Sequence, residues 1–178
     1  HLWCSAMKPN IVPTQREIEL GANDVIVSKT DLQGRITYAN RKFMQIADYS
    51  ERDLIGIQHN MIRHPDMPRG AFKLLWDTLK AEREFFGLVK NMTSDGGHYW
   101  VFANITPDRD ASGKVIGYFS FRRKPKRQAI AAIEPIYREM LAIEQSTGPA
   151  KAPEASVAFL LDKLKSMGTT YDQFILSL

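Results

Sequence analysis

Two stretches near the start of the chain have the alternation of apolar and polar residues that is typical of β-strands. Residues 25–31 (VIVSKTD) and 35–40 (RITYAN) are rich in β-branched and aromatic residues. The sequence DLQG between them contains turn-forming residues. The pattern therefore predicts a β-hairpin.

Two short helices are expected next. Residues 41–47 (RKFMQIA) follow Asn40, which is a favourable N-cap. In residues 51–56 (ERDLIG), Asp53 stands three positions after Ser50, which is the spacing of a capping box.

Residues 69–82 (RGAFKLLWDTLKAE) have the clearest helical pattern in the chain. Their apolar side chains recur at the i, i+3, i+4 and i+7 positions, namely Phe72, Leu75, Trp76 and Leu79. One stripe of this helix should therefore face the protein interior.

Three further strands are predicted in sequence. Residues 85–94 and 98–107 are joined by the strong hairpin signal DGG, and residues 114–124 follow the turn DASG. Strands that cluster without parallel crossovers indicate an α+β domain.

The N-terminal segment is expected to hold a flanking helix. We interpret residues 1–6 (HLWCSA) as a cloning remnant and Met7 as the native start. Thr14 and Glu17 have capping-box spacing, so a helix is predicted within residues 7–22.

The C-terminal third is predicted to be helical. Residues 126–145 should form a second flanking helix, which Pro135 should kink or restart. Residues 146–153 have the composition of a linker, and residues 154–178 should form a helical tail interrupted at Gly168.

The composition is that of an ordinary globular protein, with 44% hydrophobic and 25% charged residues. No apolar stretch approaches the ~20 residues that a membrane span needs. The single cysteine, Cys4, lies in the segment interpreted as a cloning remnant. Disulfides, thiolate ligands and cysteine nucleophiles are thus not expected, in keeping with a cytoplasmic protein.

Residues 122–127 (RRKPKR) hold five cations in six positions. Such a run either contacts phosphate or an anionic membrane, or simply forms a solvated strand end. No aromatic residues are interleaved with the cations, which argues against binding to nucleic acid.

Three motifs in this element order resemble the sensory PAS domain of bacterial aerotaxis receptors. They are HNMIRHPDMP (residues 59–68), LWDTLK (75–80) and GLVKNMTSDGGHYWVFANITP (87–107). The resemblance implies a PAS domain over residues 23–125, with a five-stranded antiparallel sheet and short helices over one face. It also implies bound FAD that reports redox state.

The resemblance is incomplete in two respects. Aerotaxis receptors carry membrane spans and a methyl-accepting signalling domain, and neither is evident here, so we expect signalling to a partner protein in trans. Light-sensing flavin PAS domains use a cysteine for a photoadduct, and no cysteine lies within residues 23–125.

The segment around Pro68 is predicted to bind an anion. Arg63 and His64 precede a helix whose N-terminus carries unpaired N–H groups and a partial positive charge. These features would suit an FAD diphosphate, although a rigid turn with Arg63 in a surface ion pair explains them equally well. Asp66 should either cap the helix or hold Arg63. The resemblance implies that Arg63, His64, Asp66 and Asn60 belong to the cofactor site.

The resemblance also implies flavin contacts from the helix and the strands. Trp76 would form either a wall of the flavin cavity or part of the core. On the strand, Gly87, Val89 and Asn91 share one face. The Asn91 amide would hydrogen-bond the flavin ring, and Gly87 would leave room for it.

The opposite, outer face of the predicted sheet is apolar. We assign to it Phe86, Leu88, Trp100, Phe102, Ile116 and Tyr118. Either a flanking helix or a second subunit should cover this face, and we expect a homodimer.

The residues leave several functions open. The leading hypothesis is a flavin-based redox or oxygen sensor that signals through its flanking helices. A cofactor-free interaction or dimerisation module is the alternative, and a haem-binding sensor would use His59 or His64 as axial ligand. No convergent acid–base pair or nucleophile is evident, so an enzyme is not expected.

Overall fold

A computed structural model describes residues 10–178 of the chain. Its five strands are β1 (Val25–Asp31), β2 (Ile36–Ala39), β3 (Phe85–Met92), β4 (His98–Arg109) and β5 (Val115–Arg123). They form one antiparallel sheet in the order β2-β1-β5-β4-β3. The predicted α+β class and five-stranded antiparallel sheet are confirmed.

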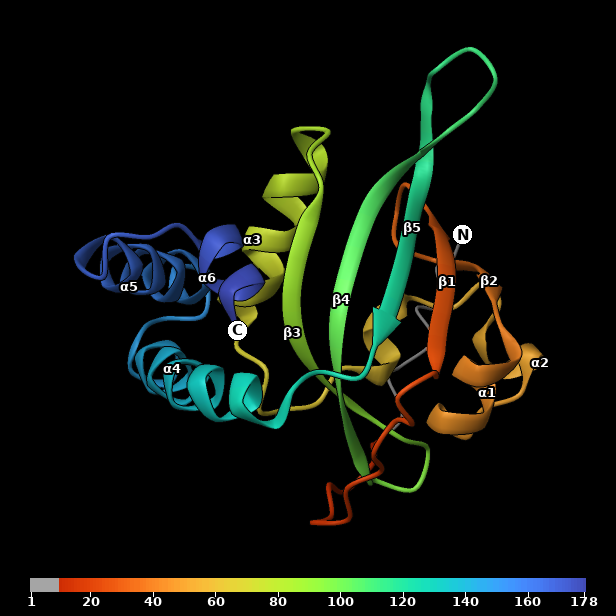
Figure 1. Cartoon of the computed structure of the whole chain (residues 1–178), viewed down its shortest axis with the longest axis horizontal. Coiled ribbons are helices and arrows are strands. Elements are labelled where there is room, and N and C mark those ends of the chain that lie inside the picture. The colour runs from red at the N-terminus through yellow and green to blue at the C-terminus, as the bar shows by residue number, and fades with distance from the viewer. Residues whose placement is uncertain (1–9) are drawn as a thin grey trace.

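The helices form two runs in the sequence, one between β2 and β3 and one after β5. The first group is α1 (Arg41–Ala47), α2 (Glu51–Leu54), the 3-10 helix η1 (His59–Ile62) and α3 (Arg69–Lys80). The second group is α4 (Arg127–Ser146), α5 (Ala152–Ser166) and α6 (Tyr171–Ser177). In space, α3 and the second group lie beside β3, at the opposite end of the sheet from α1 and α2 (Figure 1).

The predicted caps form as expected. The Asn40 side chain accepts the Phe43 N–H at the start of α1 and also accepts the N–H of Val27, which ties the helix to β1. Ser50 and Asp53 form the predicted capping box of α2. Local sequence thus determines this part of the fold.

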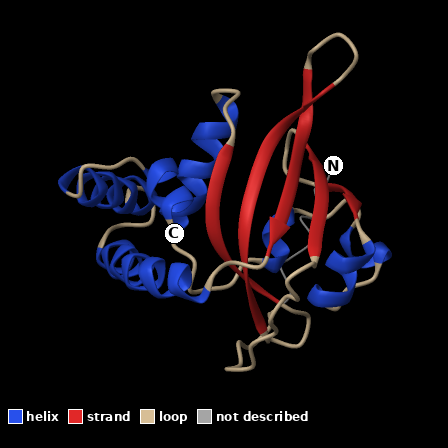
Figure 2. Cartoon of the chain, in the orientation of Figure 1, coloured by secondary structure: helices blue, strands red, loops and turns tan. Residues whose placement is uncertain are grey.

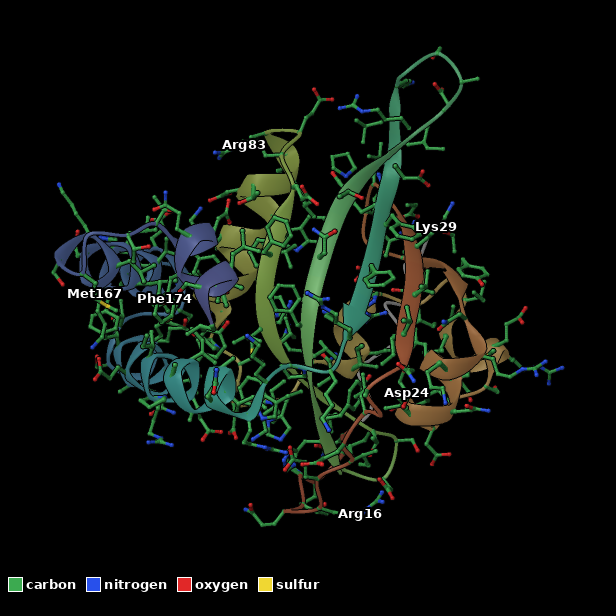
Figure 3. All side chains as sticks on the ribbon, viewed as in Figure 1. Arg16, Asp24, Lys29, Arg83, Met167 and Phe174 are labelled. Atoms are coloured by element: carbon green, nitrogen blue, oxygen red, sulfur yellow. The ribbon has the colours of Figure 1, made fainter. Side chains whose placement is uncertain are left out.

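The predicted N-terminal flanking helix is wrong. Residues 10–22 are not helical, and Ile18 N–H donates to the carbonyl of His98 while His98 N–H donates to that of Arg16. Arg16, labelled in Figure 3, also pairs with Asp95 in the β3–β4 turn. Pairing with a strand has overridden the local helix signal of the N-terminal segment. The expected cloning remnant and Met7 lie outside the described residues.

The C-terminal helices follow the prediction closely. Helix α4 continues through Pro135 without a break, contrary to the expected restart. Gly168 has φ of +73° after the end of α5, as the predicted stop requires.

Helix α4 covers one part of the outer face of the sheet. The Tyr137 hydroxyl donates to the Leu88 carbonyl on the free edge of β3, and the Tyr137 ring stacks on Trp100. Both Leu88 and Trp100 are buried. The ribbons leave the front of β4, β5 and β1 uncovered in Figure 2.

The outer-face assignment of Tyr118 is wrong because β5 contains a bulge. Val115 pairs with Arg109 and Gly117 pairs with Asp108, so Ile116 is an extra residue. One extra residue reverses the face of every residue after it. Tyr118 therefore faces inward, and Ile116 is 48% exposed beside the turn of the hairpin.

Phe119 and Phe121 occupy the outer face in its place. Phe121 is 37% exposed and Phe119 is partly buried. Lys29, labelled in Figure 3, lies over the Phe119 ring from the neighbouring strand.

Candidate functional site

A cavity lies between the inner face of the sheet and the helices η1 and α3. Its apolar lining is Phe72, Leu75, Trp76, Leu79, Val89, Ala103, Ile105 and Tyr118. Its polar lining is Thr30, Gly34, Gln58, His59, Asn60, Arg63, Asn91, Ser120 and Arg122. The predicted inward stripe of α3 thus forms one wall.

Arg63 and Asn91 meet at the free edge of β3. The backbones of the two residues form an isolated antiparallel bridge, and Asn91 is the penultimate residue of β3. The Arg63 guanidinium stacks on Phe72 of α3, and burial lowers its pKa to about 10. The charge of Arg69 contributes to this lowering, whereas Glu144 opposes it because it favours the charged form.

Three side-chain amides line the cavity and offer both donors and acceptors. Asn91 is buried on β3, while Gln58 and Asn60 lie at η1. The predicted site residues Asn60, Arg63, Trp76 and Asn91 are therefore brought together. Amides of this kind suit a ring edge with alternating carbonyl and N–H groups.

Arg122 lines the cavity from β5 and is 2% exposed. Its Nη2 donates to Ser28 Oγ at 2.6 Å, and its Nη1 lies 3.3 Å from His59 Nε2. The guanidinium also lies over the Phe43 ring. Burial lowers the pKa of Arg122 to about 10, so the side chain stays charged at neutral pH.

His59 is neutral in this arrangement. Arginine can only donate, so the His59 Nε2 that faces Arg122 must be the acceptor, and the proton resides on Nδ1. Burial and then the Arg122 charge lower the pKa of His59 to about 3. His59 Nε2 also lies 3.0 Å from Ser28 Oγ, so its lone pair is already used.

Trp76 contacts Tyr118 across the cavity. Their ring centres are 5.4 Å apart in an edge-to-face arrangement. A Cβ at Gly34 would lie 3.3 Å from the Trp76 ring, and φ of +83° also favours glycine there. The tryptophan is therefore both a cavity wall and a packed side chain.

His64 and Asp66 do not line the cavity. His64 Nδ1 accepts the backbone N–H of Asp66, and the Asp66 carboxylate pairs with Lys90 at 2.8 Å. The helix cap predicted for Asp66 is wrong, because Pro68 occupies the N-cap position of α3. Contacts with Lys90 and His64 outweigh burial and hold the pKa of Asp66 below its usual value.

The N-terminus of α3 already holds an anion from within the chain. The N–H groups of Arg69 and Gly70 donate to the two carboxylate oxygens of Glu144 at 2.8 and 2.9 Å. Ser156 donates to the same carboxylate at 2.6 Å. The phosphate position predicted at this helix end is therefore wrong, because a carboxylate from α4 occupies it.

Gly87 faces inward but does not line the cavity. A Cβ at this position would lie 2.6 Å from the Phe85 ring and 3.2 Å from the Tyr171 hydroxyl. The space next to Gly87 is thus filled by Phe85 and by Tyr171 of α6, which stack on each other.

The basic run from Arg122 to Arg127 is divided among three environments. Arg122 enters the cavity, Arg123 lies over Phe102, and Arg127 pairs with Glu17 and Glu19 of the N-terminal segment. Sequence reasoning missed Arg122 as a site residue because the bulge concealed which residues of β5 face inward. Strand alternation counted after the bulge would have identified it.

Among residues 10–178, no group of three or more His, Cys, Asp or Glu side chains is arranged to hold a metal ion. Over the same residues, none of the helices combines the length and apolar character that crossing a bilayer requires.

Comparison with known proteins gives a consistent relationship. Residues 36–122 match the family model described as PAS fold. The chain is 44% identical over 129 residues to the aerotaxis receptor of Escherichia coli, which is 72% of this chain and 25% of the receptor. It is also 31% identical over 99 residues to a nitrogen fixation regulatory protein of Klebsiella pneumoniae, covering 56% of this chain and 20% of that protein. The chain thus spans about a quarter or less of these relatives.

Solved structures with the same fold include light-oxygen-voltage domains. A domain of this class studied with a flavin analogue has a TM-score of 0.54 at 20% identity, covering 61% of this chain and 82% of that one. The light-state dimer of the fungal photoreceptor Vivid has a TM-score of 0.52 at 20% identity, covering 60% and 83%. Fold, family match and relatives together show that the chain contains a PAS domain, which is of the type found in the bacterial aerotaxis receptor.

Proposed function

We propose that the chain is a cytoplasmic redox or oxygen sensor that binds FAD in the cavity between the sheet and α3. The observation that carries the proposal is the lining itself. Two arginines and three amides converge with Trp76 and Tyr118, and none of the described lining residues is acidic. The similarity to the aerotaxis receptor supports the same assignment.

The lining suits the parts of a flavin nucleotide. Asn91 would hydrogen-bond the ring edge, and Trp76 and Tyr118 would pack against the ring. Because Glu144 occupies the α3 N-terminus, the diphosphate would be met by Arg63 at the side of the cavity bordered by Phe72. The cofactor would supply reversible electron uptake, which changes charge and hydrogen bonding at the ring.

A change at the ring has a direct route to the C-terminal helices. Asn91 and Val89 line the cavity from β3. The carbonyl of Leu88, next to Val89, accepts a hydrogen bond from the Tyr137 hydroxyl of α4. The first N–H groups of helix α3, which lines the cavity, donate to Glu144 of α4. Ser156 of α5 donates to the same carboxylate. We propose that the sensor acts on a partner protein through these helices.

Identification of the released cofactor tests the proposal. The purified protein should release a flavin on heating, and chromatography against standards should identify it as FAD. Release of FMN would contradict the assignment of Arg63 to a diphosphate. A haem absorbance band would contradict the flavin itself.

The second candidate is a cofactor-free interaction module. It is favoured by the uncovered apolar part of the outer face, which includes Phe102, Phe119 and Phe121. A homodimer through this face is compatible with either function, and the similarly folded Vivid is known as a light-state dimer. Protein that neither carries nor binds flavin, yet dimerises through this face, would favour the second candidate.

A further inference from the structure

The described residues that line the cavity include two cations and no acidic side chain. Arg63 and Arg122 both line it, His59 is neutral, and no Asp or Glu is among the described lining residues. Burial of a cation without an anion is costly, and a ligand that brings negative charge removes that cost.

Arg122 is the more deeply buried of these two cations. Within the part of the chain that the structure describes, its two terminal nitrogens have Ser28 and His59 as polar partners, and neither is charged. Its Nε is buried and has no hydrogen-bond partner among residues 10–178. A buried donor without a partner is unusual in a folded protein, and here it belongs to a charged side chain that lines the cavity.

Arg63 differs from Arg122 in both place and surroundings. It stacks on Phe72, and the nearby Glu144 favours its charged form. Arg63 therefore suits a ligand group whose charge is constant, such as a diphosphate. Arg122 reaches the cavity from β5, whereas Arg63 is bridged to Asn91 at the β3 edge.

We propose that Arg122 sets the charge preference of the site, so that the cavity binds the ligand ring more tightly when the ring is anionic than when it is neutral. This inference rests on the flavin assignment above. An oxidised flavin ring is neutral. Uptake of two electrons from a reductant such as dithionite and one proton from water gives a reduced ring with one negative charge. By thermodynamic linkage, tighter binding of the reduced ring by Arg122 also makes the bound flavin easier to reduce.

Binding of oxidised and dithionite-reduced FAD to the apoprotein tests the proposal. Dissociation constants would be measured calorimetrically without oxygen, at fixed, slightly alkaline pH, for the wild type and for Arg122→Met, Arg122→Gln and Arg122→Lys. A charge-assisted contact implies that the wild type binds reduced FAD about tenfold or more tightly than oxidised FAD. In Arg122→Met the two constants should agree within about threefold, whereas Arg122→Lys should retain the preference.

The matched control is Arg63→Met. It should weaken both forms by similar factors, because the diphosphate has the same charge in each. Circular dichroism identifies the folded variants. If Arg122→Met does not fold, Arg122→Gln takes its place, because the glutamine amide can still hydrogen-bond Ser28. If a folded variant without the charge at position 122 keeps the wild-type ratio of the two dissociation constants, this inference is wrong. The proposed binding of flavin would not be affected by that result. Failure of the wild type to bind FAD in either state would overturn the proposed function and this inference with it.

Discussion

The guanidinium carbon of Arg63 lies 3.6 Å from the centre of the Phe72 ring. The first residue belongs to the segment after η1 and the second to α3, so this stacking fixes a cation where the segment and the helix meet at the cavity. A cation held over an aromatic ring loses little further freedom when a ligand binds.

Arg63→Ala should weaken FAD binding without unfolding the protein. Loss of a charge-assisted contact reduces affinity by roughly tenfold to a hundredfold. Riboflavin, which lacks phosphate, should bind the variant and the wild type equally. Arg41→Ala, an exposed position on α1, is the control, and fluorescence titration gives the affinities. Full FAD affinity in Arg63→Ala would refute the phosphate role.

Asn91→Ala should reduce flavin affinity by removing the amide that we propose hydrogen-bonds the ring. The expected loss is about tenfold, as for one or two neutral hydrogen bonds. Asn104 is a matched control because it lies on the same sheet but bonds Glu84 on the outer face. If Asn104→Ala and Asn91→Ala lower affinity alike, the effect is on the fold and not on a ring contact.

Gly70→Ala should destabilise the protein because it disrupts the contact between α3 and α5. The new Cβ would lie 2.0 Å from Ser156 Oγ and would displace the hydroxyl from Glu144. Overpacking of this kind costs about 1–3 kcal/mol in the free energy of unfolding. Urea denaturation of Gly70→Ala, Ser156→Gly and the double variant gives the interaction energy. Additive effects would show that the two positions do not interact in this way.

Phe119→Glu combined with Phe121→Glu should yield a monomer if the outer face forms the homodimer. Burial of charged residues opposes association, while both positions are open enough to accept them in the isolated subunit. Light scattering at tens of micromolar measures the mass. Ile116→Glu, exposed beside the hairpin turn, should leave the dimer intact. A monomeric wild type would contradict the dimer directly.

Local signals in the sequence predict most of this fold. The Asn40 cap, the Ser50–Asp53 capping box and the period of α3 all depend on residues close in sequence. The Thr14–Glu17 spacing is equally local, but hydrogen bonds to the residues around His98 decide the structure there. Helix propensity is a weak guide to the structure of a segment that can hydrogen-bond to a neighbouring strand.

The candidate site was only partly predictable because two of its features depend on distant residues. Glu144 reaches the α3 N-terminus from α4, and no pattern around Pro68 reveals it. The inward direction of Arg122 depends on the extra residue Ile116. Trp76 and Asn91 lie on a helix and a strand whose inward faces follow from regular spacing, whereas the assignment of Arg63 rests on the helix that follows it and on the resemblance to aerotaxis receptors.

Titration of the flavin-free protein with FAD, followed by absorbance and fluorescence, is the most direct test of the central claim. We predict saturable binding of one FAD per chain, with a structured flavin absorbance band that dithionite bleaches and air restores. Protein that stays folded yet shows no saturable change at a large excess of FAD would contradict flavin sensing in this cavity.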